Sequence, residues 1–354
     1  MGAVNTAAPS GEDIAWFRDG VSLAATARGA ASTLARRVGL SSHRSAEVAL
    51  AVTEAATNIQ RHADDGALLL RVVRAGDQAG VEFLTVDSGP GMTDVPAALA
   101  DGTSSAGTLG IGLGAVSRLA DQFDLHSVPG RGTVMAARFW PRTAGAPALV
   151  TSPELSTVGG VTRPISGETV CGDAWAVRTD DRDSAGDRPA TLVMLCDGLG
   201  HGPLAARASQ AAVRAFHETR DHSPAGALEA VHRALRGTRG GAVAVARIEP
   251  AAGRLLYCGI GNISGFLLGD GGRRALLSAP GIVGAHMRRL RTFDEPLPAH
   301  GALVMHSDGL TERWDHATLP GLLHHTPLVM AGQLLREAGG RRDDAGVVVI
   351  KGAW

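Results

Sequence analysis

The stretch LAVTEAATNIQRH, residues 50–62, decides how the first half of the chain is interpreted. Its apolar residues recur at spacings of three and four, which predicts a helix with one buried face. On that helix Glu54, Asn58 and His62 lie four residues apart and share one face. The amide oxygen of Asn58 suits Mg²⁺, a hard ion that keeps most of its waters and bridges phosphates. Glu54, one turn away, could accept a proton from an attacking hydroxyl or water.

Two glycine-rich segments follow this helix. Asp87 ends a strand-like run and is followed by Gly89 and Gly91. Its carboxylate could accept a hydrogen bond from an exocyclic amine, and the glycines would let the backbone approach a flat base closely. The segment GTLGIGLG, residues 107–114, runs into a predicted helix. Its backbone amides and the helix N-terminus could bind phosphate oxygens.

The first half is expected to be an α+β sandwich, with helices on one face of a largely antiparallel sheet. The apolar periods predict helices at 21–38, 44–62 and 115–122, and strands at 67–74, 81–86, 124–128 and 133–140. A turn containing Gly130 and Gly132 precedes the last strand. All the polar and glycine-rich segments therefore fall at helix faces or strand ends, where a ligand could bind.

In their order and spacing, these segments and Gly130-Arg-Gly-Thr133 resemble the N, G1 and G2 boxes of the GHKL (HATPase) superfamily, a two-layer α/β sandwich. The resemblance covers roughly residues 13–140 and is strongest to RsbT-like switch kinases, which phosphorylate Ser or Thr on small STAS-domain regulators. It implies ATP and Mg²⁺ as cofactors, with Asn58 for Mg²⁺, Glu54 as general base and Asp87 for adenine. The other nucleotide-binding residues that it implies are His62, Gly89, Gly91, Gly110, Gly112, Gly114 and Thr133.

The second half carries aspartates at the ends of apolar, strand-like runs, at Asp173, Asp197, Asp308 and the pair 343–344. A single Asp-Gly step predicts only a turn. Carboxylates that converge in one cleft would repel one another strongly, even at an effective dielectric constant of about 20, unless cations lay between them. Ligation by oxygen alone favours Mg²⁺ or Mn²⁺ over zinc. Two such ions could lower the pKa of a bridging water and hold a phosphate ester for in-line attack.

The expected elements of this half are sheets enclosed by helices. Strands are predicted at 158–163, 174–178, 191–196, 241–248, 254–259, 264–268, 302–306 and 346–350, and helices at 205–218 and 225–235.

This constellation resembles the metal-dependent PPM-type protein phosphatases of the SpoIIE branch, an αββα sandwich, and residues 163–173 (RPISGETVCGD) resemble RsbX-like members most. It implies two Mn²⁺ or Mg²⁺ ions, with Asp197 and Asp308 at the catalytic centre. The implied ligands are Asp173, Asp197, Asp308, Asp343 and the carbonyl of Gly198. Asp344 stands where relatives often carry Asn, so its role is left open. His201 could approach the phosphate or could be structural in its turn.

Length and composition restrict the number of domains and the classes of function that are possible. With 354 residues, 44% hydrophobic residues and a net charge of −1, the chain is long enough for two globular domains and too balanced for a nucleic-acid-binding footprint. Lys351 is the single lysine, which excludes phosphate-loop and Schiff-base lysines. The Pro- and Ala-rich break at 141–156 is expected to be a linker between domains at 13–140 and 157–354. With neither a secretion signal nor a membrane span in the sequence, a cytoplasmic location is expected.

The leading hypothesis is a bifunctional partner-switching regulator of bacterial stress or sigma-factor signalling. A Ser/Thr kinase-like domain would phosphorylate STAS-domain proteins, and a phosphoserine/phosphothreonine phosphatase would dephosphorylate them. The resemblance implies STAS-domain proteins in both forms as partners, with a sigma factor or a downstream phosphatase as a further candidate, and neither nucleic acid nor membrane. The alternative is a phosphatase whose first domain is a non-catalytic, nucleotide-dependent anti-sigma-like binding module. A third hypothesis is ATP hydrolysis coupled to conformational change.

Overall fold

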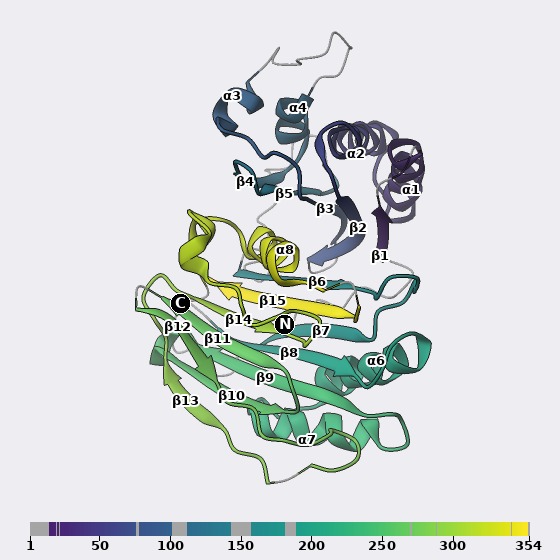
Figure 1. Ribbon diagram of the computed structural model, residues 1–354. Helices are drawn as coiled ribbons and strands as arrows, with labels where there is room; N and C mark the ends of the chain where they lie inside the picture. The colour runs from purple at the N-terminus through teal and green to yellow at the C-terminus, as the bar shows by residue number, and fades with distance from the viewer. Residues whose placement is uncertain are drawn as a thin grey trace. The chain divides into compact units, whose positions relative to one another are not determined.

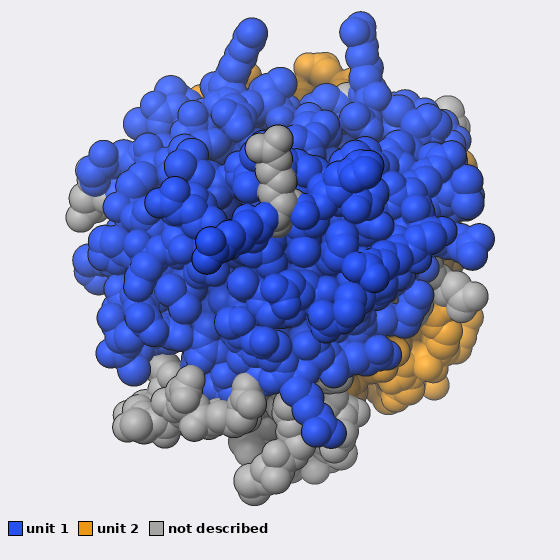
Figure 2. All heavy atoms as spheres, turned by 90° about the horizontal axis from the view of Figure 1, so that it is seen from below, with its two compact units in different colours: residues 1–8, 153–354 blue, residues 9–152 orange. Residues whose placement is uncertain are grey.

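The computed structural model describes residues 14–18, 20, 22–75, 78–100, 112–142, 157–180, 189–269, 271–287, 289–340 and 342–352. The chain divides into two compact units, Pro9–Ser152 and Pro153–Trp354, and the second also takes in Met1–Ala8 (Figure 2). Each unit has its own core and is described by itself. We call Pro9–Ser152 the ATPase-like unit and Pro153–Trp354 the carboxylate unit.

The ATPase-like unit is an antiparallel sheet with helices on one face (Figure 1). The strand order is β1-β2-β3-β5-β4, and every neighbouring pair is antiparallel. Buried alanines, valines and leucines of the helices pack against alternate residues of the strands, among them Leu68, Leu70 and Phe83. The elements are β1 (Ile14–Arg18), α1 (Leu23–Arg37), α2 (Ser42–His62), β2 (Gly66–Ala75), β3 (Gln78–Asp87), α3 (Val95–Leu99), α4 (Gly112–Leu119), β4 (Gln122–Val128) and β5 (Gly132–Phe139).

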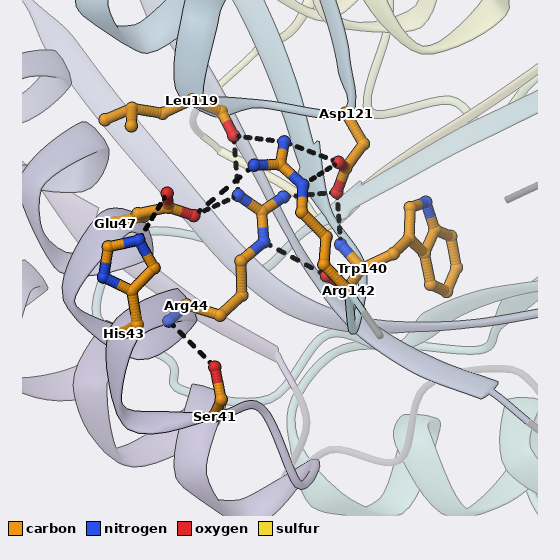
Figure 3. A network of polar contacts seen from close by, with 8 residues as sticks. All are labelled: Ser41, His43, Arg44, Glu47, Leu119, Asp121, Trp140 and Arg142. Carbon is orange, nitrogen blue, oxygen red and sulfur yellow. Dashed lines mark hydrogen bonds and ion pairs between the residues drawn. The ribbon is translucent and has the colours of Figure 1, made fainter. Parts of the chain in front are cut away.

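A buried arginine fixes the start of α2 (Figure 3). Ser41 caps the helix by accepting from the backbone N–H of Arg44 at 3.1 Å. The Arg44 guanidinium donates to the carbonyls of Trp140 at 3.1 Å and Leu119 at 2.7 Å, and it forms ion pairs with Glu47 and Asp121. Leu119 is the last residue of α4, and Asp121 and Trp140 follow α4 and β5. One side chain therefore holds α2 to the ends of two other elements.

The carboxylate unit consists of two packed sheets with helices on both outer faces (Figure 1). Its sheets have the strand orders β13-β10-β9-β8-β7 and β12-β11-β14-β15-β6. The elements are β6 (Val158–Arg163), β7 (Asp173–Asp180), β8 (Ala190–Gly198), α6 (Pro203–Glu218), α7 (Pro224–Leu235), β9 (Gly241–Glu249), η3 (Pro250–Ala252), β10 (Arg254–Ile260), β11 (Ser264–Gly269), β12 (Gly272–Leu276), β13 (Phe293–Pro296), β14 (Ala302–His306), η4 (His316–Thr318), η5 (Leu322–His324), α8 (Pro327–Ala338) and β15 (Ala345–Lys351).

Successive residues along the strands of this unit face two different hydrophobic cores in alternation. Val193 and Leu195 of β8 face the second sheet and pack with Met305 and Val348. The residues between them, such as Met194, face the opposite way, toward α6 and α7. Helix α8 packs on β6 and β15. The result is an αββα sandwich, which confirms the predicted α+β fold class.

Several elements differ from the sequence-based expectation. The helix predicted at 115–122 is α4, which spans Gly112–Leu119. It ends earlier than predicted because Gln122 already pairs with Arg138 in the sheet. Helix α8 was not predicted, since nearly all of its residues are buried and it lacks a polar face. Strands β1, β12 and β13 were also not predicted; each is an edge strand that pairs on one side only. Among the described residues, the structure has no helix that is both long and apolar enough to cross a membrane.

Candidate functional site

Helix α2 presents the predicted polar residues along one side. Val48, Ala51, Val52, Ala55 and Ile59 form its buried face. Glu54 and Asn58 are half-buried, and His62, the last residue of the helix, is exposed. The side-chain nitrogen of Asn58 is buried and has no hydrogen-bond partner among the described residues. An unsatisfied buried amide is costly, which fits a ligand at this position.

Asp87 is oriented by two backbone amides. Its Oδ1 accepts hydrogen bonds from the N–H groups of Gly89 at 2.9 Å and Thr133 at 3.2 Å. The first bond closes the turn after β3, and the second ties that turn to the start of β5. The carboxylate is therefore held in a fixed direction at the end of the sheet.

Glycines bring three backbone segments into contact around Asp87. A Cβ on Gly89 would lie 2.4 Å from the carbonyl oxygen of His62, so the turn packs directly on the end of α2. A Cβ on Gly132 would lie 2.0 Å from the carbonyl oxygen of Asp87, and one on Gly91 would lie 2.1 Å from that of Val128. Gly91 and Gly132 also have positive φ values of 66° and 85°. No other residue fits at these positions without displacing the backbone.

A pair of hydroxyl groups lies beside the backbone segments around Asp87. The hydroxyl groups of Ser127 and Thr133 lie 2.9 Å apart, and Ser127 accepts a hydrogen bond from the N–H of Met92 at 2.8 Å. Thr133 was predicted from its motif, whereas Ser127 was missed. A serine in a strand carries no sequence signal of its own, and only the pairing of β4 with β5 places it beside Thr133.

The predicted glycine-rich phosphate segment is described only in its last part. Gly110 lies outside the described residues. Gly112 begins α4 with a φ of 69°. A Cβ on Gly114 would lie 2.4 Å from the carbonyl oxygen of Leu99, so Gly114 allows α4 to pack closely on α3.

In the carboxylate unit, two predicted aspartates face each other across a strand pair. Asp173 of β7 is directly opposite Asp197 of β8. The Oδ2 atom of Asp173 accepts a hydrogen bond from the Ser307 hydroxyl at 2.6 Å, and Ser307 in turn accepts from the N–H of Gly346 at 2.8 Å. The Oδ1 atom of Asp173 is buried without a hydrogen-bond partner among the described residues. This oxygen is a candidate metal ligand.

Burial and neighbouring negative charge raise the pKa values of these carboxylates. Burial raises the pKa of Asp173 well above its usual range, and the charge of Asp197 raises it further. Burial, Asp308 and Asp343 raise the pKa of Asp197 to about 7. Burial and Asp343 also raise the pKa of Asp308. Each carboxylate thus disfavours the ionised form of its neighbours, and a cation between them would reverse that effect.

Hydrogen bonds from one side chain and from several backbone N–H groups orient the remaining acids. Asn262 donates to Oδ2 of Asp308 at 2.6 Å. Oδ1 of Asp343 accepts from the N–H of Asp344 at 2.9 Å. Asp344 itself accepts backbone N–H groups on both oxygens, from Ile165 at 2.7 Å and from Gly172 at 2.6 Å. Asp344 therefore ties the loop before β7 to the start of β15, and the sequence left this role open.

Two glycines allow the Asp-Gly turns to pack closely. A Cβ on Gly198 would lie 2.4 Å from the carbonyl oxygen of Ala205, and one on Gly309 would lie 1.9 Å from that of Asp344. The N–H of Gly198 donates to the carbonyl of Gly172 at 3.2 Å. His201 pairs with Glu168 at 3.3 Å on the exposed side of its turn.

The acids supply the oxygen donors that Mg²⁺ and Mn²⁺ prefer, but they do not form a complete coordination shell. Within the described ranges, no three His, Cys, Asp or Glu side chains are grouped closely enough to hold one ion. The donors are nonetheless all oxygens, one of them buried and unsatisfied, and burial together with the neighbouring acids raises the pKa of Asp197. Hard divalent cations prefer such donors.

The fold and these two sites define a class of protein, in which a histidine kinase-like ATPase domain is combined with a PPM-type serine/threonine phosphatase domain. Residues 18–138 match the family described as "Histidine kinase-like ATPase domain", and residues 187–351 match "Stage II sporulation protein E (SpoIIE)".

Relatives of both units are found in Bacillus subtilis (strain 168). The chain is 35% identical to serine/threonine-protein kinase RsbT over 116 residues, which are 33% of this chain and 87% of RsbT. It is 23% identical to phosphoserine phosphatase RsbX over 145 residues, 41% of this chain and 69% of RsbX. A crystal structure of RsbX with magnesium has 19% identity and a TM-score of 0.45, covering 54% of this chain and 92% of that one. The chain belongs to the RsbT family through its ATPase-like unit and carries a SpoIIE-type phosphatase domain in its second, which confirms both predicted resemblances.

Proposed function

We propose that this chain is a partner-switching regulator that both adds phosphate to and removes phosphate from STAS-domain proteins. The observation that carries the proposal is the facing pair Asp173–Asp197, in which Asp173 is buried and Asp197 half-buried, in the same chain as the Glu54–Asn58 face of α2. Its two relatives are a serine/threonine kinase and a phosphoserine phosphatase. A chain that combines both activities can set the phosphorylation level of one partner.

In the ATPase-like unit, the proposed ligand is ATP with Mg²⁺. The direction of the Asp87 carboxylate, fixed by Gly89 and Thr133, suits the exocyclic amine of adenine. Asn58 would hold Mg²⁺, which would neutralise charge on the transferred phosphate. Glu54 would accept the proton of the attacking Ser or Thr hydroxyl, one helical turn from Asn58. The roles of His62 and of the glycine-rich segment are proposed from the same motif resemblance.

In the carboxylate unit, the proposed cofactors are two Mn²⁺ or Mg²⁺ ions held by Asp173, Asp197, Asp308, Asp343 and the carbonyl of Gly198. These ions would lower the pKa of a water that attacks the phosphate ester. The other polar residues of this site position its carboxylates. Ser307 orients Asp173, and Asn262 orients Asp308.

The proposed partners are STAS-domain proteins in their phosphorylated and unphosphorylated forms, with a sigma factor or a downstream phosphatase as a further partner. A cytoplasmic location is part of the same proposal. The near-zero net charge supports protein partners over nucleic acid, which would require a basic surface.

The test is incubation of the full chain with ATP, Mn²⁺ and candidate STAS proteins, followed by intact-mass spectrometry. We expect Asp197→Ala to let phosphorylated STAS protein accumulate and Glu54→Ala to prevent phosphorylation while ATP binding is retained. If Glu54→Ala binds ATP and phosphorylates as well as the parent, Glu54 is not the base. If the parent binds ATP but no STAS protein is ever phosphorylated, the ATPase-like unit is a binding module and only the phosphatase proposal stands.

A further inference from the structure

The turn after Asp197 and the first turn of α6 expose two leucines in the chain segment that follows Asp197. Leu199 is 41% exposed and Leu204 is 50% exposed. Among the described residues, the only other exposed large apolar side chains are Leu50 and Leu277. Exposed apolar surface gains nothing from folding, so these two side chains are available for contact with another protein.

An arginine lies against the same segment. The guanidinium nitrogen Nη1 of Arg239 is 2.8 Å from the place where a Cβ on Gly200 would stand. The turn that carries Arg239 is fixed there, because the N–H of Leu199 donates to the carbonyl of Gly240 at 3.0 Å. Arg239 is exposed and forms neither a hydrogen bond nor an ion pair with any described residue. Its donors are therefore available to a partner.

These side chains are within reach of a substrate bound at Asp197. Leu199 is two residues from Asp197, and two residues span at most about 7 Å. A phosphoserine whose phosphate lies at the carboxylates brings its neighbouring residues within reach of this segment. The carboxylates repel acidic side chains of a protein bound here, and the exposed Arg239 guanidinium beside Gly200 can pair with such a side chain and offset that repulsion.

We propose that Leu199, Leu204 and Arg239 form a docking rim that binds the phosphorylated protein substrate of the carboxylate unit. The leucines contact an apolar side chain near the phosphoserine, and the guanidinium binds a carboxylate of the same protein. The inference rests on the proposed phosphatase function and adds what that function does not state, namely how a protein substrate is distinguished from a small phosphate ester.

The test compares two substrates in the full chain with Mn²⁺: p-nitrophenyl phosphate, and a STAS-domain protein phosphorylated on serine. Leu204→Ala and Arg239→Ala should each lower kcat/KM for the phosphoprotein by roughly tenfold, mainly through KM, and should leave kcat/KM for p-nitrophenyl phosphate within about twofold. The loss from Arg239→Ala should shrink as salt is raised, whereas that from Leu204→Ala should not. Leu277→Ala and Arg214→Ala, which change an exposed leucine and an exposed arginine elsewhere in the same unit, are the matched controls.

The following outcomes would overturn the docking rim or the function on which it rests. Equal losses on both substrates would overturn the rim, because the residues would then act through the catalytic carboxylates. Unchanged kinetics on the phosphoprotein would overturn it as well. A parent that hydrolyses neither substrate would instead remove the phosphatase function itself. A parent active only on p-nitrophenyl phosphate would overturn the STAS partner and the rim together.

Discussion

The two candidate sites of this chain are built by opposite physical means. The site around Asp87 is built by close backbone approach, with Gly89, Gly91 and Gly132 at positions where a Cβ would clash with a carbonyl oxygen. The site around Asp173 is built from neighbouring acidic side chains, the innermost of them buried, that raise one another's pKa. Neither uses a lysine; the single one, Lys351, donates to the carbonyl of His325 at 3.1 Å.

This difference determines what each site is sensitive to. The first depends on the shape of the backbone, so small steric changes should damage it while pH and metal removal should leave its framework intact. The second depends on charge compensation, so changes of charge, pH or metal should damage it most. Substitutions matched between the two sites can separate these sensitivities.

The largest effect is expected from Asp197→Ala. Removing one of the facing carboxylates should lower phosphatase activity on p-nitrophenyl phosphate with Mn²⁺ by roughly 100-fold or more, while ATP binding by the other unit stays unchanged. Asp294→Ala, an exposed acid of the same unit, serves as the control. Activity equal to that of the parent would show that Asp197 holds no catalytic metal.

A steric change should have the next largest effect, at the Asp87 site. In Gly132→Ala the new Cβ meets the carbonyl oxygen of Asp87, so we expect ATP affinity measured by calorimetry to fall by about tenfold or more, which is about 1.4 kcal/mol. Gly130→Ala is the control, because Gly130 also has a positive φ of 74° but nothing lies within 4 Å of its Cβ position. Equal losses in both variants would mean that backbone strain, and not the contact with Asp87, is responsible.

Asp344→Asn should destabilise the carboxylate unit. Asn offers one acceptor oxygen where Asp344 accepts two backbone N–H groups, so one amide loses its partner at a cost of about 1–3 kcal/mol. For a unit of this size that corresponds to a Tm lower by roughly 2–10 °C in calorimetry. Phosphatase activity should fall less than in Asp197→Ala. A Tm equal to that of the parent would refute the role of Asp344 as a structural tie.

The smallest expected effect is the pH dependence of stability without metal. Burial and neighbouring acids raise the pKa of Asp197 from 3.8 to about 7, so the folded state binds this proton more tightly than the unfolded state. The contribution of Asp197 to stability is therefore fully present below about pH 4 and is lost as pH rises through about 7. The Tm of the carboxylate unit should fall over that range in the metal-free protein and recover when Mn²⁺ is added.

The ATPase-like unit should behave differently over the same range. Burial would raise the pKa of Glu82, but Arg138 and Arg71 hold it below its usual range. Its contribution to stability is therefore present above about pH 4.5 and is lost only in more acidic solution. A fall of both transitions between pH 4 and 7 would contradict the assignment of the effect to the facing carboxylates.

Local patterns in the sequence were enough to predict the main elements and the motifs. The face of α2 was predictable because helical spacing places Glu54 and Asn58 together without any tertiary contact. Strand alternation likewise predicted most of the sheet strands. Helix α8 escaped this reasoning because burial on all sides removes the polar face that marks an amphipathic helix.

The supporting contacts could not be predicted in the same way. Ser307 meets Asp173 across 134 positions of the chain, and Asp344 meets Gly172 across 172. Ser307 precedes Asp308 in its Asp-Gly segment and Asn262 lies outside the predicted segments, and only the packing of the two sheets reveals that both orient carboxylates. Long-range hydrogen bonds of this kind depend on the completed fold.

The most direct test of the central claim, that both units act on the same phosphate, is the amount of inorganic phosphate released per STAS protein. With ATP, Mn²⁺ and a limiting amount of STAS protein, the parent should release phosphate far beyond the amount of that protein. Asp197→Ala should transfer about one phosphate per STAS protein and then stop, with almost no free phosphate. If Asp197→Ala releases free phosphate as fast as the parent, the ATPase-like unit merely hydrolyses ATP and the account is wrong.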